Sequence, residues 1–439
     1  MTVIRIPVAP PSTTGSRDAT IDAVRAISLL FVVVLHALMV GAWIGPDGSL
    51  LTKVALTGEP WFAPATWAVQ VMPLFFIAGG FVSLQQWRRL RGRGAGVGEY
   101  VTGRVRRLAV PTAVMLGAVG AALVLARSLG ADVSLIAEAS LRIGQPLWFL
   151  AVYIGVTTLV PAMAWLHERA SRLTLVGLAA GALAIDIASR ESGFALGYVN
   201  LAFVWLLMQQ LGFVMLDGRL NAWPGRRLFA GMGAALALLL LCLFLGWSPD
   251  MIENLNPPTV ALVLLGVAQF FALQLARPWL DRITGRPRVA GMTARAGEGA
   301  MSVYLWHMPM IMLLVAVMWG LGLPMPEPHT AAWWATRLPW LVTVFTIVLP
   351  AAAVVAGFDR PLMRWADRLA AHPLVAAVPD GIRALLAALL ATAGTTVALL
   401  IGLDGWLPAA LAVGFLLTAV VLSSARAGEG AARRRDADE

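Results

Sequence analysis

Arg25 and His36 have the spacing in this chain that most directly suggests chemistry. They lie eleven residues apart in a mainly apolar run, which is close to a whole number of helical turns. On a helix the two side chains would share a face, about 16 Å apart along the axis. Arg25 would then lie at a membrane surface and His36 inside the bilayer, where an ionisable group is costly and points to function. The alternative is a neutral His36 hydrogen-bonded between helices, with Arg25 anchoring the helix end.

A second pair, Tyr304 and His307, falls near the middle of another apolar run. Residues three apart lie on one face of a helix, and Pro309 follows at once, where it can kink the helix. If the two apolar runs cross the membrane in the same direction, His36 and His307 can approach a common interior cavity. The alternative for His307 is a structural hydrogen bond between helices.

A third pair, Arg104 and Arg107, precedes an apolar run at helical spacing. Two arginines on one face can grip the phosphates of a nucleotide-like ligand through charge-assisted hydrogen bonds. The alternative is that they set membrane topology or touch lipid phosphates. Arg25 is expected either to join them or to pair with Asp22. Trp148, at the start of a later apolar run, is most simply an anchor at the membrane interface.

The elements that position these residues are membrane helices. The chain has 439 residues, 59% of them hydrophobic and 13% charged, and its mean hydropathy is +0.78. No soluble domain needs that much apolar surface. The net charge of +9 belongs to arginines between the apolar runs, so the positive-inside rule explains it better than nucleic-acid binding. The single Cys242 excludes a disulfide framework or a cysteine-based metal site, and no metal is expected.

Hydropathy predicts an all-α, polytopic membrane bundle of about twelve helices. The spans are expected at 23–43, 67–86, 108–128, 147–166, 173–189, 197–216, 228–247, 258–276, 299–322, 338–357, 384–402 and 406–424. Arginines concentrate in the loops after spans two, eight and ten and are sparse in the alternate loops, so both termini are predicted to be cytoplasmic. The Pro/Ser/Thr-rich segment 1–21 is predicted to be disordered, and 425–439 is predicted to be a charged cytoplasmic tail.

Several short motifs, taken in order, resemble those of the acyltransferase-3 family of integral membrane O-acyltransferases. The resemblance covers roughly residues 17–357. It rests on the spacing of Arg25 and His36 with Asp22 before them, Pro73-Leu-Phe-Phe with its glycines, Arg104-x-x-Arg107 before Pro111, Leu147-Trp-Phe-Leu150, and Tyr304-Leu-Trp-His307. Each motif is weak alone, and their order along the chain makes the set more specific.

The chain departs from the family pattern in two places. Family members often have Ser where Ala78 or Gly79 stands here, so that hydroxyl is missing. The usual core has ten spans, which leads to a division into a membrane domain at 22–357 and a segment at 358–424 that holds a cytoplasmic loop and two additional helices. The esterase-like domain that some relatives carry does not follow these helices, so the acceptor is expected to be reached without it.

The resemblance implies transfer of a short acyl group, commonly acetyl, from cytosolic acyl-CoA to a hydroxyl of an extracytoplasmic glycan or glycolipid. The enzyme would lie in the plasma (inner) membrane of a bacterium, with acyl-CoA (acetyl-CoA) as co-substrate and no permanently bound cofactor. The predicted site consists of the catalytic His36 and His307, the CoA-binding Arg25, Arg104 and Arg107, and the cavity residues Tyr304, Trp148 and Asp22. His36 would act as general base or carry the acyl group itself, and both routes stay open.

The competing hypothesis is a twelve-span secondary transporter or a lipid or glycan flippase. In that case His36 or His307 would relay protons. The two halves of the chain show no convincing similarity to each other, and a transporter leaves the pair Arg104 and Arg107 without a role. The sequence contains no serine hydrolase elbow, no His-Glu-x-x-His motif and no glycine-rich nucleotide loop. It does not fix the acceptor or the oligomeric state.

Overall fold

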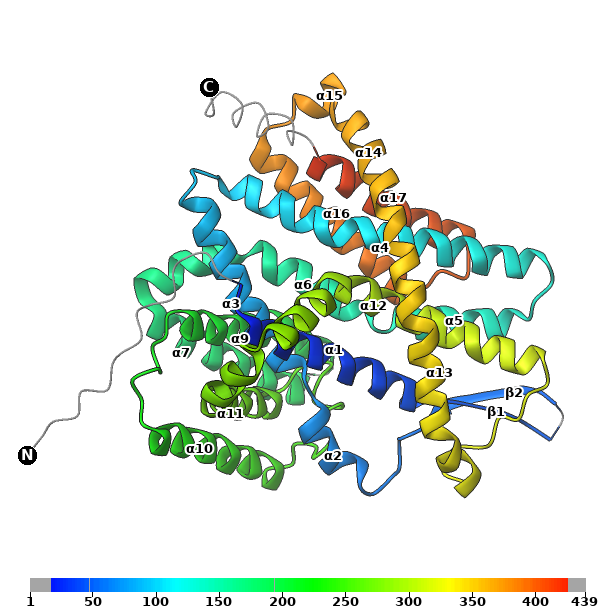
Figure 1. The fold of residues 1–439 in the computed structure, drawn as a ribbon, viewed down its shortest axis with the longest axis horizontal. Helices are drawn as coiled ribbons and strands as arrows, with labels where there is room; N and C mark the ends of the chain where they lie inside the picture. The colour runs from blue at the N-terminus through cyan, green and yellow to red at the C-terminus, as the bar shows by residue number, and fades with distance from the viewer. Residues whose placement is uncertain (1–16, 47, 193, 425–439) are drawn as a thin grey trace, which may run out of the picture.

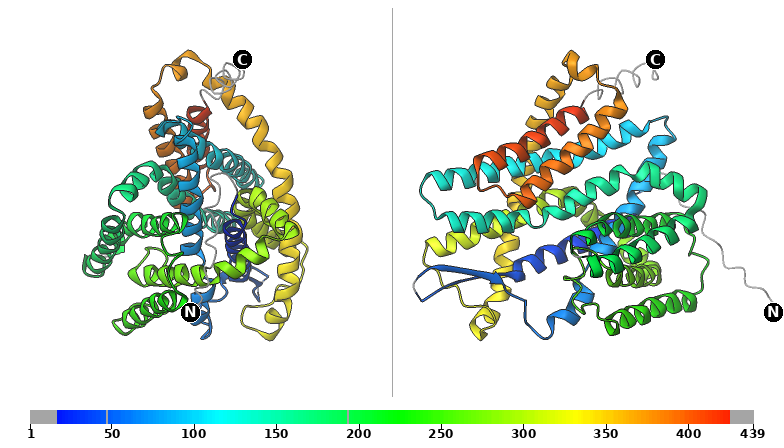
Figure 2. Two further views of the ribbon diagram at one scale, coloured as in Figure 1. Left: turned by 60° about the vertical axis from the view of Figure 1, so that its left-hand side comes forward. Right: turned by 180° about the vertical axis from the view of Figure 1, so that it is seen from behind.

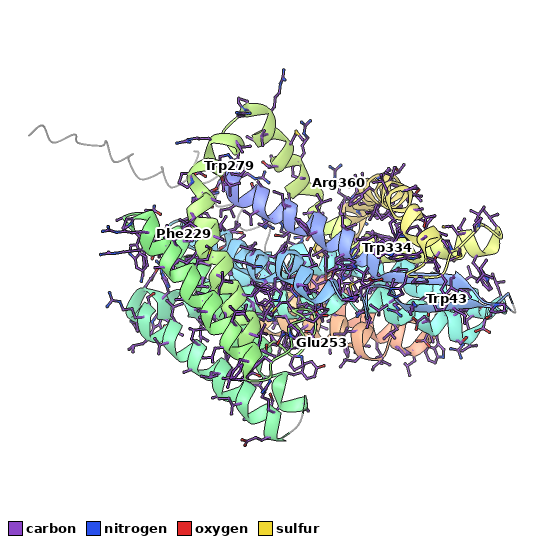
Figure 3. The ribbon with its side chains drawn as sticks, turned by 90° about the horizontal axis from the view of Figure 1, so that it is seen from below. Trp43, Phe229, Glu253, Trp279, Trp334 and Arg360 are labelled. Carbon is purple, nitrogen blue, oxygen red and sulfur yellow. The ribbon has the colours of Figure 1, made fainter. Side chains whose placement is uncertain are left out.

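The protein folds as a bundle of membrane helices. The computed structural model describes residues 17–46, 48–192 and 194–424, and within them twelve helical stretches are long and apolar enough to cross a membrane. This confirms the all-α, polytopic fold and the number of spans. A helix satisfies its own backbone hydrogen bonds, as the bilayer interior requires. Apolar side chains such as Phe229 and Trp279 are largely exposed on the outer surface (Figure 3).

Most helices are long and run as an irregular bundle (Figures 1 and 2). The long helices are α1 (Ala19–Met39), α3 (Met72–Arg91), α4 (Val97–Ser128), α7 (Val160–Ser192), α9 (Asn200–Leu216), α10 (Gly225–Phe244), α11 (Val260–Thr284), α12 (Pro287–Gly320), α13 (Ala331–Val355), α16 (Asp380–Leu400) and α17 (Trp406–Ser424). Shorter elements are α2 (Phe62–Val69), α5 (Val133–Gly144), α6 (Leu147–Thr158), α8 (Phe194–Gly197), the 3-10 turn η1 (Ala356–Phe358), α14 (Asp359–Ala370), α15 (Pro373–Ala376), β1 (Val40–Ile44) and β2 (Leu50–Val54).

Helix α1 runs through the middle of the bundle, against α3 and α12 (Figure 1). It begins at Ala19 because the Asp18 carboxylate accepts hydrogen bonds from the backbone N–H of Thr20 and Ile21, at 3.1 and 3.0 Å. The prediction of disorder over 1–21 is therefore wrong for the residues from Ala19 to Ile21. Residues 1–16 and the predicted tail 425–439 lie outside the described residues.

The first span ends at Met39, four residues before the predicted end, and a β-hairpin follows. Strands β1 and β2 pair antiparallel, with Val40 opposite Val54 and Ile44 opposite Leu50. The run of apolar residues continues from the helix into β1, so hydropathy alone does not separate the two elements. The hairpin places β2 beside the mouth of the cavity described below.

Two helix boundaries affect the candidate site. Helix α4 begins at Val97, about three turns before the predicted start of the third span, so the arginine pair lies within a continuous helix. Helix α7 bends at Ala170, whose φ of −148° and ψ of 48° are not helical. This bend falls between the predicted spans four and five. The short helix α5 was not predicted, because its charged and polar residues lower its mean hydropathy.

Helices α3 and α9 approach so closely that only glycine fits between them. A Cβ atom on Gly80 would lie 2.3 Å from the carbonyl oxygen of Gln209, and one on Gly212 would lie 2.1 Å from that of Ile77. The absence of a side chain at Gly80 and Gly212 therefore permits the close helix contact. The neighbouring Gly79 instead leaves room for the ring of Tyr153, which would lie 3.2 Å from a Cβ atom there.

The two C-terminal helices, α16 and α17, pack against each other and against α4. A Cβ atom on Gly394 would lie 2.7 Å from the carbonyl oxygen of Ala412, so these two helices are also in close contact. The turn between them is tied to α5, because the backbone N–H of Leu403 donates to Ser140 Oγ at 2.6 Å. The pair therefore supports the helix that carries Arg104 and Arg107.

Candidate active site

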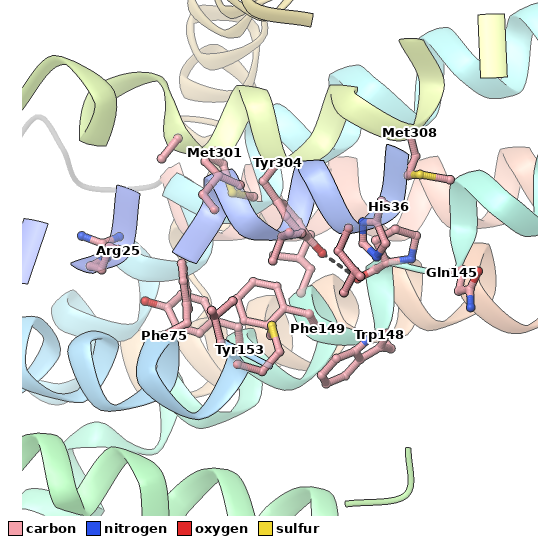
Figure 4. Close-up of a pocket in the computed structure, with 18 of the residues that line it drawn as sticks. Arg25, His36, Phe75, Gln145, Trp148, Phe149, Tyr153, Met301, Tyr304 and Met308 are labelled. Carbon is pink, nitrogen blue, oxygen red and sulfur yellow. Dashed lines mark hydrogen bonds between the residues drawn. The ribbon is translucent and has the colours of Figure 1, made fainter. Parts of the chain in front are cut away.

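A cavity of about 510 Å³ lies inside the bundle and is lined mainly by α1, α3, α4, α6 and α12. His36 lines its middle, with Arg25 towards one end and Gln145 towards the other (Figure 4). The cavity connects the two groups of residues that the sequence singled out, the intramembrane histidine and the arginines. It also exposes polar side chains at the far end that the sequence did not single out.

His36 and His307 are hydrogen-bonded to each other, with 2.8 Å between His36 Nδ1 and His307 Nε2. Their rings are stacked, at 5.0 Å between centroids and 8° between planes. His307 Nδ1 lies 2.5 Å from the carbonyl oxygen of Tyr304, and a carbonyl only accepts. His307 therefore carries its proton on Nδ1, so its Nε2 accepts the proton of His36 Nδ1. His36 is left with an unprotonated Nε2.

The two histidines are not equivalent in their access to the cavity. His36 lines it, and in the described chain no hydrogen-bond partner lies on its Nε2. His307 is 0% exposed and is absent from the lining, so the expectation that it faces the cavity directly is wrong. It lies behind His36, on the turn of α12 before Pro309, with its ring packed against that of His36 on α1. The two histidines are therefore in contact with each other, and only His36 lines the cavity.

Tyr304 lines the cavity beside His36 and fixes α12 against α6. Its hydroxyl donates to the carbonyl oxygen of Pro146 at 2.6 Å. Trp148 also lines the cavity, in a wall of aromatic rings that continues through Phe149 and Tyr153, whose centroids lie 5.3 Å apart. The sequence motif around Trp148 lies in this wall. Phe149 and Tyr153 are four residues apart on α6, and this helical spacing was the signal that could have predicted both as further wall residues.

Three arginines line the other end of the cavity: Arg25, Arg104 and Arg107. Arg104 is only 8% exposed. Its Nη2 donates to Ser83 Oγ at 3.2 Å, while its Nε is buried and has no hydrogen-bond partner among the described residues. Arg107 lies one turn further along α4, on the same face. The buried, incompletely paired guanidinium group of Arg104, with the more exposed Arg107 beside it, is well suited to an anionic ligand.

Asp22 holds Arg25 in place from outside the cavity. The two side chains lie 3.8 Å apart across one helical turn, and Asp22 also pairs closely with Arg17. Asp22 is buried but does not line the cavity, so its predicted place among the cavity residues is wrong. The Arg25 side chain extends past it over the ring of Phe75, 5.9 Å from the centroid. Both expectations for Arg25 hold together, because it pairs with Asp22 and joins the other arginines.

Other intramembrane polar residues join helices to one another. The amide groups of Asn200, Gln209 and Gln210 donate to the carbonyl oxygens of Ala182, Val156 and Met163 at 2.8–3.0 Å. Asp186 accepts from Trp247 Nε1 and from the backbone N–H of Val260. None of these residues lines the cavity.

His167 on α7 is another buried histidine, and no pattern in the sequence singled it out. Its Nδ1 lies 2.8 Å from Gln210 Oε1, and its Nε2 lies 3.0 Å from Asp217 Oδ2. Arg88 adds an ion pair to Asp217 at 2.6 Å. Burial opposes the charge on Asp217, but the bonds from His167 and Arg88 outweigh it and hold the pKa of this carboxyl well below its usual range. No spacing along the chain predicts this cluster, because its members come from three separate helices.

Within the described residues, no three His, Cys, Asp or Glu side chains are grouped so as to hold a metal ion. The cavity itself offers an imidazole, aromatic rings and guanidinium groups. A buried imidazole with a free nitrogen can accept a proton from a hydroxyl, and the guanidinium groups can hold phosphates.

The family model for an acyltransferase domain, Acyl_transf_3, matches residues 18–357. No curated protein and no solved structure matches the chain. The matched range begins at the cap of α1 and ends within η1, so it contains the two histidines, the three arginines and nearly the whole cavity wall. Because the match covers most of the chain, the protein belongs to the acyltransferase-3 family of membrane acyltransferases.

Proposed function

We propose that the protein moves a short acyl group, acetyl in the simplest case, from cytosolic acyl-CoA to a hydroxyl of an extracytoplasmic glycan or glycolipid. The observation that carries this proposal is the single cavity that joins His36 to the three arginines. Coenzyme A is multiply anionic, so its phosphates would stay at the arginines, and its slender pantetheine arm would extend into the cavity towards His36.

The donor end carries more positive than negative charge. Glu298 and Asp359 are the acidic residues that line the cavity in the described chain, against the three arginines. The stem of Arg104 is buried against Tyr100, with the guanidinium 5.5 Å from the ring centroid. In such a partly dehydrated place, hydrogen bonds from a guanidinium group to phosphate are stronger than in water.

His36 has the tautomer that a general base needs. Its Nε2 takes the proton of the acceptor hydroxyl as the oxygen attacks the thioester carbon. The C–S bond breaks, the new ester forms, and the proton passes from Nε2 to the CoA sulfur. Throughout, His307 keeps the other nitrogen of His36 protonated, and its own Nδ1 stays bonded to the Tyr304 carbonyl. An acyl-His36 intermediate uses the same nitrogen as nucleophile.

Labelled acetyl-CoA tests the proposal. Purified protein in proteoliposomes should release CoA thiol and transfer label to an extracytoplasmic fraction rich in glycans and glycolipids. His36→Ala should abolish both, and His372→Ala is the matched control, since His372 lies outside the cavity in the loop before α15. Uptake of a solute without any need for acyl-CoA would instead support the transporter hypothesis.

The orientation is part of the same proposal. The arginine-rich loops between spans favour both termini on the cytoplasmic side of the plasma (inner) membrane. Fusions of a reporter active only in the cytoplasm should give signal at the C-terminus and after residue 286, and none after residue 248. The reverse pattern would place the arginine end of the cavity outside and would rule out cytosolic acyl-CoA as donor.

A further inference from the structure

A second polar cluster lines the cavity at the end opposite the three arginines. Arg142 lies in the last turn of α5, and Gln145 follows three residues later at its C-cap, so the two lie on neighbouring positions of one face. Asn256 lines the same cavity from the loop before α11. Figure 4 shows Gln145 beyond His36 as seen from Arg25, with Trp148 nearby.

Arg142 is fixed through one side of its guanidinium group. Its Nε donates to Glu138 Oε1 at 2.7 Å, and the same oxygen accepts from Thr52 Oγ1 of β2 at 3.2 Å. In the described part of the chain, its two Nη atoms have no hydrogen-bond partner. They form the flat, two-donor end that binds the paired oxygens of a carboxylate or phosphate.

The rest of the cluster suits a polar ligand with hydroxyl groups. The amides of Gln145 and Asn256 each offer donors and an acceptor, and neither makes a side-chain hydrogen bond with the described residues. The indole of Trp148 adds an apolar face. Among the described residues that line this end of the cavity, Arg142 is the only charged one, so a bound anion would meet no opposing carboxylate in the lining.

We propose that Arg142, Gln145 and Asn256 form the acceptor subsite, and that the acceptor carries an oxyanion, a carboxylate or a phosphate, near the hydroxyl that is acylated. The inference rests on the proposed function and specifies, in addition, that the acceptor is negatively charged. The salt bridge to Glu138 does not compete with the ligand, because it occupies Nε and leaves the Nη end to the cavity. It holds the guanidinium group in position for binding.

Binding of small sugars to the purified protein in nanodiscs tests the subsite. Glucuronic acid supplies a carboxylate, glucose 6-phosphate a phosphate, and glucose is the neutral reference. We expect at least one charged sugar to bind at least about tenfold more tightly than glucose. The R142Q variant should lose that preference. The stronger of the two charged sugars identifies the oxyanion.

Arg127→Gln is the matched control. Arg127 lies near the same end of the bundle, donates to the carbonyl oxygen of Asp404 at 3.3 Å and does not line the cavity. It should keep the preference of the native protein. If R142Q does not fold, R142M removes the same charge and keeps the apolar stem. Equal binding of the three sugars by the native protein, or an unchanged preference without Arg142, would overturn the proposal.

Acyl-CoA binding, measured on the same samples, separates this inference from the proposed function. R142Q should bind acyl-CoA as the native protein does, because Arg142 lies at the far end of the cavity from Arg104. If the native protein discriminates between the sugars but neither binds nor consumes acyl-CoA, the proposed function fails and the anion subsite remains.

Discussion

Two buried histidine sites in this protein differ in what their ring nitrogens contact. In the pair of His36 and His307, neutral groups surround the rings, and one nitrogen of His36 is open to the cavity. His167 is as deeply buried, at 1% exposed, yet both its nitrogens have partners, Gln210 and Asp217. Within the described residues, no cavity residue is hydrogen-bonded to this second site.

The difference separates a histidine that can react from one that holds helices together. His307 and His167 are both fully buried, so the presence of a buried histidine does not distinguish the two sites. A free nitrogen beside a cavity permits proton transfer to a ligand, whereas a histidine bonded on both sides in an ion-pair network contributes stability and shape. The charges around His167 join α3, α7 and α9 at one end of the bundle.

The largest expected effect is on the reaction, through His36. General-base catalysis contributes roughly 10²–10⁴-fold, so His36→Ala should lower kcat by at least about 10²-fold. His167→Ala should leave kcat of the folded protein within a few-fold of native and lower its thermal stability. The comparison fails if the activity of purified, monodisperse protein falls equally in both variants.

His307 is expected to act through His36 as a positioning residue. His307→Ala removes the acceptor for His36 Nδ1–H, so it should lower kcat by roughly 10-fold to 10²-fold and shift the pH profile of kcat. His307→Gln offers a side-chain oxygen in place of Nε2 and should recover part of the rate. If Gln and Ala give the same rate and the native pH profile, His307 has only a packing role.

The arginine pair should affect donor binding more than the chemical step. Hydrogen bonds to charged groups contribute about 1.5–3 kcal/mol each, so Arg104→Ala or Arg107→Ala should raise the Kd for acetyl-CoA about tenfold or more, with a larger effect at low salt. Arg106→Ala is the control, because Arg106 pairs with Asp367 at 2.8 Å and does not line the cavity. If the double variant at 104 and 107 binds acetyl-CoA with native affinity, the two arginines only set the membrane topology.

The smallest effect should come from the Tyr304 hydroxyl. Tyr304→Phe loses one hydrogen bond to the Pro146 carbonyl and keeps the ring beside His36. A neutral hydrogen bond contributes about 1 kcal/mol, which predicts a several-fold fall in kcat. A loss as large as that of His36→Ala would mean that the hydroxyl takes part in the reaction.

The spacing of residues predicted much of the site, because its parts follow helix periodicity. The eleven-residue interval from Arg25 to His36 places both along one cavity, and the three-residue interval from Tyr304 to His307 predicted a shared helix face. The bond between the two histidines joins residues 271 positions apart. No local pattern encodes it, so neither the tautomer of His36 nor the burial of His307 could be derived from the sequence.

Hydropathy located the spans because the bilayer requires long apolar helices. It missed α5, which is amphipathic and carries Arg142. It also placed the end of the first span inside β1, because the apolar run continues beyond the end of α1. The cluster around His167 was also missed, since three helices contribute to it. In each case the missing information was a contact between distant segments.

The packing of α16 and α17 on α4 has a consequence for where the chain can be cut. The family match stops at residue 357, which suggests that the remainder is dispensable. Shortening the protein there would expose to lipid a contact made by small residues, where a Cβ atom on Gly120 would lie 3.1 Å from the Cβ of Ala409. The autonomous unit for expression or for grafting into another host therefore extends at least to Ser424.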